Sequence, residues 1–162
     1  EYYEDAYLLF SVPEFTRSLA NNTRSASKVY AVDPAMFGAF SPASALDQGQ
    51  RLETAGFNAL RRRTPAVRVG SVCRLLVKEK NKSHEVDFVA GDALLMQAYS
   101  LTQVSVDMAS EKTREREIAA LDASMAQFDL GESVIVTMDE QADIPCEHGV
   151  VHAVPAWKWL LA

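Results

Sequence analysis

The chain has 162 residues, of which 48% are hydrophobic and 23% are charged. This composition is ordinary for a globular protein, and the length corresponds to about one domain. Its 16 basic and 22 acidic residues give a formal net charge of −6, which argues against nucleic-acid binding by the whole surface and against a cationic membrane-surface protein, while leaving room for a local basic patch.

Cysteine content and apolar runs indicate where the chain resides. Two cysteines are too few for a disulfide scaffold and predict a reduced, cytoplasmic setting. No apolar run approaches the ~18 residues of a membrane-spanning helix, so we expect no membrane contact. The start, Glu1–Asp5, is acidic and aromatic and lacks an initiator Met. We therefore expect a fragment of a longer chain or a processed product, without a signal peptide.

The N-terminal region contains two short β-prone segments. Tyr7–Val12 and Lys28–Val32 are apolar and are separated by a polar turn, which predicts a β-hairpin. Ser41–Ser44 is typical of a linker. The sequence therefore predicts an extension over 1–40 and an α/β domain over 45–162.

The first long helix is predicted over Asp47–Arg63. Its apolar residues recur at helical spacing and form one buried face, and Glu53 lies on the flank of that face. The helix ends in Arg61, Arg62 and Arg63, which favours either a solvated helix end or a patch that contacts phosphate groups.

The remainder alternates between strands and helices. This succession predicts an α/β fold with a mixed sheet. Strands are expected over Val67–Val77, His84–Ala90, Leu94–Val106, Ser133–Thr137 and Val150–Val154, and helices over Ser110–Phe128 and Ala156–Leu161.

Polar residues within two of these strands are the main candidates for chemistry. Asp87 lies in a strand interior, where Asp is depleted, which predicts a paired or functional role. Alternation places Glu85, Asp87 and Val89 on one face and Val86 and Phe88 on the other.

Cys146, His148 and His152 form a second, weaker pattern. They offer three zinc-ligand types but lack a second cysteine pair, so the pattern favours a hairpin turn over a zinc site.

Seven short motifs, in order and covering nearly the whole chain, resemble a domain of unknown function that follows the ATPase module in predicted AAA+ ATPases of bacteria and archaea. That resemblance implies an αβββαβ core similar to restriction-endonuclease-like, or PD-(D/E)XK, nucleases. The motifs are Glu4–Phe10, Lys28–Tyr30, Arg51–Glu53 with Leu60–Arg63, Glu85–Val89, Gln103–Ser105, Thr113–Glu117 and Pro155–Leu160.

The resemblance also implies site residues. Glu53 matches the helix acid of those nucleases, Asp87 matches the strand Asp, and Gln103 and Ser105 fall where an acid-x-Lys pair would be. Two carboxylates would hold Mg²⁺, which activates a water molecule. Gln103 is a weaker metal ligand than a carboxylate and Ser105 brings no charge, so a degenerate site is expected. Glu85 is the alternative carboxylate, and Lys82 or Lys112 is the alternative to the lysine of the pair.

The expected role follows from this degeneracy. We expect a catalytically degenerate nuclease-fold module of an AAA+ ATPase that interacts with the rest of that chain, with another protein or with nucleic acid. No glycine is followed by lysine, so this fragment should not hydrolyse ATP. The alternatives are a Mg²⁺-dependent nuclease, in which Glu53 and Asp87 bind the metal, and a homo-oligomerisation domain that uses Trp157, Trp159 and the N-terminal tyrosines.

Overall fold

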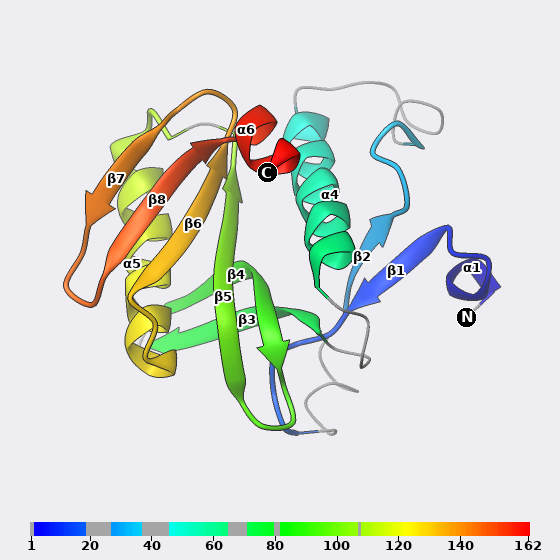
Figure 1. The fold of residues 1–162 in the computed structure, drawn as a ribbon, viewed down its shortest axis with the longest axis horizontal. Coiled ribbons are helices and arrows are strands. Elements are labelled where there is room, and N and C mark those ends of the chain that lie inside the picture. Colours follow the sequence, from blue (N-terminus) through cyan, green and yellow to red (C-terminus); the bar gives the residue numbers. More distant parts are fainter. Residues whose placement is uncertain (1, 19–26, 37–45, 65–70, 80–81, 107) are drawn as a thin grey trace.

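A computed structural model describes residues 2–18, 27–36, 46–64, 71–79, 82–106 and 108–162. It shows an α/β protein with a six-stranded mixed sheet and a separate two-stranded antiparallel sheet near the N-terminus (Figure 1). The elements are α1 (Tyr2–Asp5), β1 (Leu9–Val12), β2 (Lys28–Ala31), α4 (Leu46–Arg63), β3 (Val72–Glu79), β4 (Lys82–Asp92), β5 (Gln97–Ser105), α5 (Glu111–Phe128), β6 (Glu132–Thr137), β7 (Ala142–Pro145), β8 (Val150–Pro155) and α6 (Ala156–Leu161).

The predicted N-terminal hairpin is present. Strands β1 and β2 pair antiparallel, with Leu9 opposite Ala31 and Val12 opposite Lys28. Strand β1 starts two residues later than predicted because Tyr7 has a φ of 56°, which breaks the extended conformation after α1. The predicted linker and the boundary between 1–40 and 45–162 lie outside the described residues.

The six strands run in the order β3-β4-β5-β6-β8-β7. Strands β3, β4 and β5 pair antiparallel, β5, β6 and β8 pair parallel, and β7 is antiparallel to β8. Helix α5 makes the crossover between the parallel strands β5 and β6, as a parallel pair requires. The expected succession of helix, three strands, helix and strand is therefore present from α4 to β6.

Strands β5 and β7 differ from the prediction for local reasons. Strand β5 begins at Gln97 rather than Leu94, because the carboxylate of Asp92 accepts hydrogen bonds from the backbone N–H groups of Leu94 and Leu95 at 2.9 and 3.1 Å and closes a turn. Met96 completes that turn with a φ of 55°. Strand β7 was not predicted, because its four residues lack an apolar pattern.

Apolar clusters lie on both faces of the large sheet. Helix α5 covers one face, where Leu121 and Met125 pack against Leu101, Ile135 and Val151. Helices α4 and α6 and the β1–β2 hairpin lie on the other side, where Tyr30, Phe57 and Phe88 form an aromatic group. The hairpin thus shares a core with the main sheet rather than forming a separate body.

A register shift in β4 corrects the predicted face assignment. Cys73 pairs with Val89 but Leu75 pairs with Val86, so β4 carries an extra residue between them. As a result Val86 and Val89 both belong to the cluster on the α5 side, whereas Phe88 packs with the hairpin. The alternation of side chains predicted the wrong face for Val89, because the bulge in β4 reverses which face the residues beyond it occupy.

The outer edge of β3 is met by the segment after β1. Arg74 donates its N–H to Pro13 O at 2.9 Å and accepts at its own carbonyl from Phe15 N–H at 2.7 Å. This pairing ties the N-terminal segment to the main sheet.

Across the described ranges, no helix combines the length and apolar character that a membrane crossing demands.

Candidate functional site

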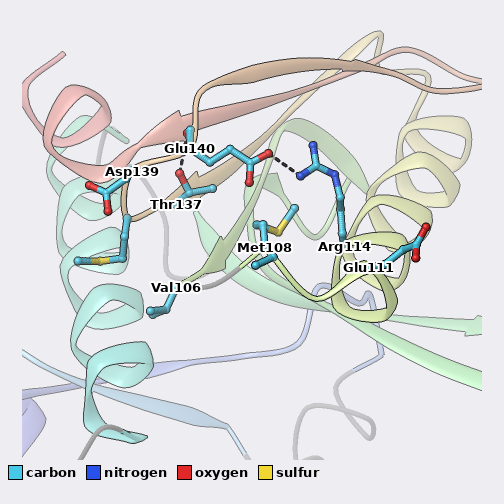
Figure 2. A pocket seen from close by; sticks show the side chains of 9 residues that line it. Val106, Met108, Glu111, Arg114, Thr137, Asp139 and Glu140 are labelled. Atoms are coloured by element: carbon cyan, nitrogen blue, oxygen red, sulfur yellow. Dashed lines mark hydrogen bonds and ion pairs between the residues drawn. The ribbon is translucent and has the colours of Figure 1, made fainter.

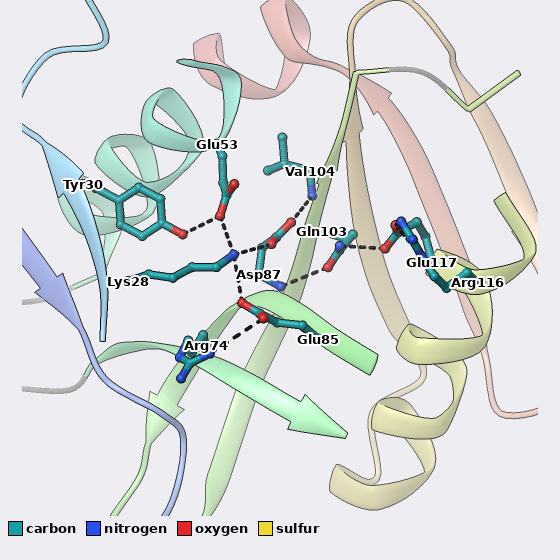
Figure 3. A network of polar contacts seen from close by, with 10 residues as sticks. All are labelled: Lys28, Tyr30, Glu53, Arg74, Glu85, Asp87, Gln103, Val104, Arg116 and Glu117. Atoms are coloured by element: carbon teal, nitrogen blue, oxygen red, sulfur yellow. Dashed lines mark hydrogen bonds and ion pairs between the residues drawn. The ribbon is translucent and has the colours of Figure 1, made fainter. Parts of the chain in front are cut away.

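Three carboxylates converge on the ammonium group of Lys28 (Figure 3). Lys28 Nζ lies 2.7 Å from Glu53 Oε1, 2.8 Å from Glu85 Oε1 and 3.0 Å from Asp87 Oδ1. The lysine comes from the start of β2, Glu53 from α4, and the other two acids from β4. We call these four residues the Lys28 cluster; it unites the helix acid and the strand Asp of the sequence analysis.

Neighbouring groups fix the two acids that are most enclosed. The hydroxyl of Tyr30 donates to Glu53 Oε1 at 2.5 Å. The backbone N–H of Val104 donates to Asp87 Oδ2 at 3.0 Å, and Asp87 is only 7% exposed. Both carboxylates are therefore oriented by hydrogen bonds in addition to Lys28 (Figure 3).

Gln103 connects the cluster to α5 instead of facing Lys28. Its Oε1 accepts a hydrogen bond from the backbone N–H of Asp87 at 2.9 Å, and its Nε2 donates to Glu117 Oε2 at 2.7 Å. Glu117 is buried and is also paired with Arg116. Since a side-chain amide can satisfy a backbone donor and a carboxylate at once, Gln103 holds β4, β5 and α5 together.

Ser105, the other residue at the expected acid-x-Lys position, is buried near the end of β5, opposite Thr137 of β6. It lines neither of the cavities beside Lys28. In the structure it is thus a strand residue apart from the cluster.

The pKa values in the cluster reflect competition between burial and charge. Burial and the nearby Glu53 raise the pKa of Asp87 to about 7, although Lys28 and the Val104 N–H oppose the rise. Burial by itself lowers the pKa of Lys28, but attraction to Asp87 and contacts with Glu53 and Glu85 outweigh it and raise that pKa. Burial, followed by the charge of Glu53, also raises the pKa of Tyr30. Lys28 therefore stays protonated at neutral pH.

Glu85 is the least firmly held acid of the cluster. Its Oε2 lies 3.7 Å from Arg74 Nη1, beyond hydrogen-bond distance. Its Oε1 is buried and has no hydrogen bond of good geometry, even though Lys28 Nζ is 2.8 Å away. This carboxylate is held by charge more than by directed hydrogen bonds.

Two cavities flank Lys28. One, of about 270 Å³, lies between the cluster and α5 and includes His84 and Arg116 in its lining. The other, of about 210 Å³, lies toward Tyr30, Gln50 and α4. Lys28 thus lines one cavity on the side of α5 and another on the side of α4.

The three arginines at the end of α4 lie apart from the cluster, about 12 Å or more from Glu53 along the helix axis. The guanidinium of Arg61 stacks 3.9 Å from the ring centre of Phe10, and that of Arg63 stacks 4.5 Å from that of Trp159 and also donates to its carbonyl. Arg62 is exposed. Two of the three thus cover aromatic rings.

A larger hollow of about 520 Å³ lies beyond β5 and β6 and shares no residue with the cluster (Figure 2). Arg114 pairs there with Glu140, whose backbone carbonyl accepts from Thr137 Oγ1 at 2.7 Å. Since Arg114 is already paired with Glu140, this open hollow is a weaker candidate for a functional site than the Lys28 cluster.

The Cys-His pattern does not gather at one point. The ring of His148 lies 3.1 Å from Asp122, the ring of His152 lies 2.7 Å from Asp143, and Cys146 Sγ contacts Ile144 O. Each group thus has its own local partner.

Lys28 is the cluster residue that sequence reasoning missed. Lys82 and Lys112 were considered as substitutes for the expected lysine, but Lys28 was not, because a hairpin far away in the sequence gives no signal of where its side chains point. Its spacing to Tyr30 was the available signal, since residues i and i+2 of a strand share a face.

Comparisons with family models, with curated proteins and with solved structures found no match to this chain.

Proposed function

We propose that this chain is a nuclease-fold module of an AAA+ family ATPase, with a catalytically degenerate centre, that acts by binding a partner. The order of elements from α4 to β6 and the meeting of Glu53 with Asp87 support this proposal. Since one fold carries many functions, the case for degeneracy rests on the site and not on the architecture.

The observation that carries the proposal is the position of Lys28. A nuclease of this kind needs a divalent cation between its carboxylates and a second group that positions water. Here an ammonium group already lies between the carboxylates, and Gln103 is committed to Glu117. The centre thus contains a cation of its own at the place where a metal would bind.

A cleavage assay tests this proposal. The chain is incubated with plasmid DNA and with short DNA and RNA duplexes in Mg²⁺ and in Mn²⁺, beside the Asp87→Ala variant. We expect no cleavage above background from either protein. Cleavage by the wild type that Asp87→Ala abolishes would overturn the proposal and establish the nuclease alternative, which the excess of three carboxylates over one ammonium favours.

Among partners, the proposal favours a protein. The net charge is −6, and Arg61 and Arg63 are held against aromatic rings. By contrast, apolar side chains are exposed beside the hairpin, with Tyr7 66% and Val29 55% exposed. Exposed apolar surface of this kind suits contact with a protein better than contact with phosphate groups.

Salt-dependent binding separates the partner classes. If the partner is nucleic acid, affinity falls steeply with salt, and Arg62→Ala weakens binding more than the matched change Arg17→Ala far from α4.

Self-association is the remaining alternative, for which the exposed Trp157 and Tyr2 are the candidate contacts. Sedimentation at increasing concentration detects it as a rise in mass.

A further inference from the structure

The Lys28 cluster has the right donor atoms for a divalent cation but the wrong size. Its three carboxylate oxygens lie 2.7, 2.8 and 3.0 Å from Lys28 Nζ. Magnesium requires oxygen ligands at ~2.0–2.1 Å and calcium at ~2.3–2.6 Å. The arrangement is therefore sized for an ammonium group, and a metal does not fit while Lys28 is in place.

The cluster nevertheless contains more negative charge than Lys28 neutralises. Three acids face one ammonium, and among the described residues the further cation paired with these acids is Arg74, 3.7 Å from Glu85. Glu85 Oε1 is buried without a well-directed hydrogen bond. Since three carboxylates share Lys28 and the more distant Arg74, the partly buried site keeps an excess of negative charge, which favours uptake of a further cation.

The backbone that carries Lys28 is anchored independently of its charge. Lys28 pairs with Val12 in the hairpin, and two residues later the Tyr30 ring stacks on Phe57 with centroids 4.8 Å apart. The side chain lines both flanking cavities, of about 270 and 210 Å³. A change of this one side chain therefore alters the cluster without removing the hairpin.

We propose that Lys28 is a tethered counter-ion that keeps divalent cations out of the Glu53–Glu85–Asp87 cluster, and that loss of its charge turns the cluster into a binding site for one hard divalent cation such as Mn²⁺ or Mg²⁺. The inference rests on the proposed function in assuming that the centre is inactive because its own cation fills it. It adds that Lys28 is the side chain that fills the centre, and that a divalent cation takes its place when its charge is removed.

The test measures Mn²⁺ binding by the full chain, without nucleic acid, by calorimetry and by electron paramagnetic resonance. Lys28→Met keeps the length of the side chain and removes its charge, whereas Lys28→Arg keeps the charge. We expect Lys28→Met to bind one Mn²⁺ per chain about tenfold or more tightly than the wild type or Lys28→Arg, because one repelling charge is gone. Only Lys28→Met should gain melting temperature on addition of Mn²⁺.

The double variant Lys28→Met/Asp87→Asn identifies the site. It should lose the added affinity, whereas weak binding by the separate group Asp122, Glu147 and His148 should be the same in all variants. If Lys28→Met does not fold without metal, Lys28→Met/Glu85→Gln, which has less charge repulsion, takes its place.

The inference is overturned if the charge-free variants bind Mn²⁺ no more tightly than the wild type, or if the double variant with Asp87→Asn keeps the added affinity. These outcomes are independent of the cleavage assay. Cleavage by the wild type would refute the proposed function, and equal Mn²⁺ affinity would refute the role of Lys28.

Discussion

Asp87 is the residue at which burial and charge oppose each other most directly. It is 7% exposed, contacts Lys28 and lies near Glu53, and its pKa is raised to about 7. An unfolded Asp titrates near pH ~4. Between these two values the folded chain holds more protons than the unfolded chain, so the Asp87 contribution to stability is present at low pH and is lost as the pH rises through about 7.

This sign predicts how Asp87→Asn behaves. Asn keeps an acceptor for the Val104 N–H but does not titrate. The stability of the variant relative to the wild type should therefore improve between pH 5 and pH 8, by about 1 kcal/mol or more for each unit by which folding raises the pKa of Asp87 within that range. Thermal unfolding at both pH values measures this. Glu115→Gln, an exposed change on α5, should show no such trend, and a relative stability of Asp87→Asn that declines with pH would contradict the assignment.

The hydroxyl of Tyr30 makes a separate prediction. Tyr30→Phe keeps the ring stacked on Phe57 and removes only the hydrogen bond to Glu53, so we expect a loss of about 1.5–3 kcal/mol, as for hydrogen bonds to charged groups. Urea unfolding measures this loss in the free energy of unfolding, and the dependence of that free energy on urea concentration should be unchanged. The matched change Tyr99→Phe, at a residue that is 61% exposed, should cost almost nothing, and equal costs would show that the Glu53 contact contributes little.

At the residue scale the sequence predicted the cluster in part. Asp87 was proposed because Asp is depleted in strand interiors and because it matches the strand Asp of the resemblance, whereas the role of Glu53 followed from the resemblance alone. Lys28 was missed because side-chain convergence from a distant hairpin depends on tertiary packing, which periodicity does not encode. Gln103 was assigned to the right strand, but its partner Glu117 lies on a helix whose orientation the pattern left open.

At the scale of single elements, the start of β8 depends on a close backbone approach. A Cβ atom on Gly149 would lie 2.3 Å from Gly131 O and 2.7 Å from Gly131 C, and neither backbone atom can move aside cheaply. That same carbonyl accepts from Val150 N–H at 2.9 Å, so the contact joins the β7–β8 turn to the start of β6.

We therefore predict that Gly149→Ala destabilises the chain by about 1–3 kcal/mol, as other overpacked sites do. Gly131→Ala is the matched control, because a Cβ there meets nothing within 4 Å. Denaturant midpoints of the two variants give the comparison, and a Gly149→Ala midpoint equal to that of the control would contradict the close approach.

Long periodic elements were the predictable part of the fold. The apolar stripe of α4 and the branched run of β6 matched their expected positions to within about one residue. Short elements were not predictable: α1 and β7 each have four residues and lack a regular pattern. The bulge in β4 was invisible because it depends on how β3 pairs with β4 and not on β4 alone.

At the scale of the whole molecule, the hairpin and the main sheet share one core. Tyr30 packs against both Phe57 and Phe88, with ring centroids 4.8 and 5.5 Å apart. The expected boundary between 1–40 and 45–162 stays a prediction, because it lies outside the described residues; composition along the chain could not show that the hairpin supplies core residues.

This shared core predicts that a fragment of residues 45–162 is less stable than the full chain and binds a hydrophobic dye, because it exposes Phe57 and Phe88. A loss of about 3 kcal/mol or more is expected, as for removal of a buried aromatic side chain. Thermal unfolding and dye fluorescence of the two proteins measure it. A fragment that melts at the temperature of the full chain would show that the hairpin is an independent appendage.

The two outer strands of the large sheet restrict how another chain could join it. At one margin β7 is only four residues long and carries Asp143 and Pro145, which discourage further pairing; at the other, Pro13 and Phe15 already take backbone hydrogen bonds of Arg74 in β3. Extension of the sheet by a ligand strand is therefore disfavoured at β7 and is obstructed at Arg74 of β3. A partner of this fold should be recognised by side-chain complementarity, and a short peptide in extended form should compete poorly for it.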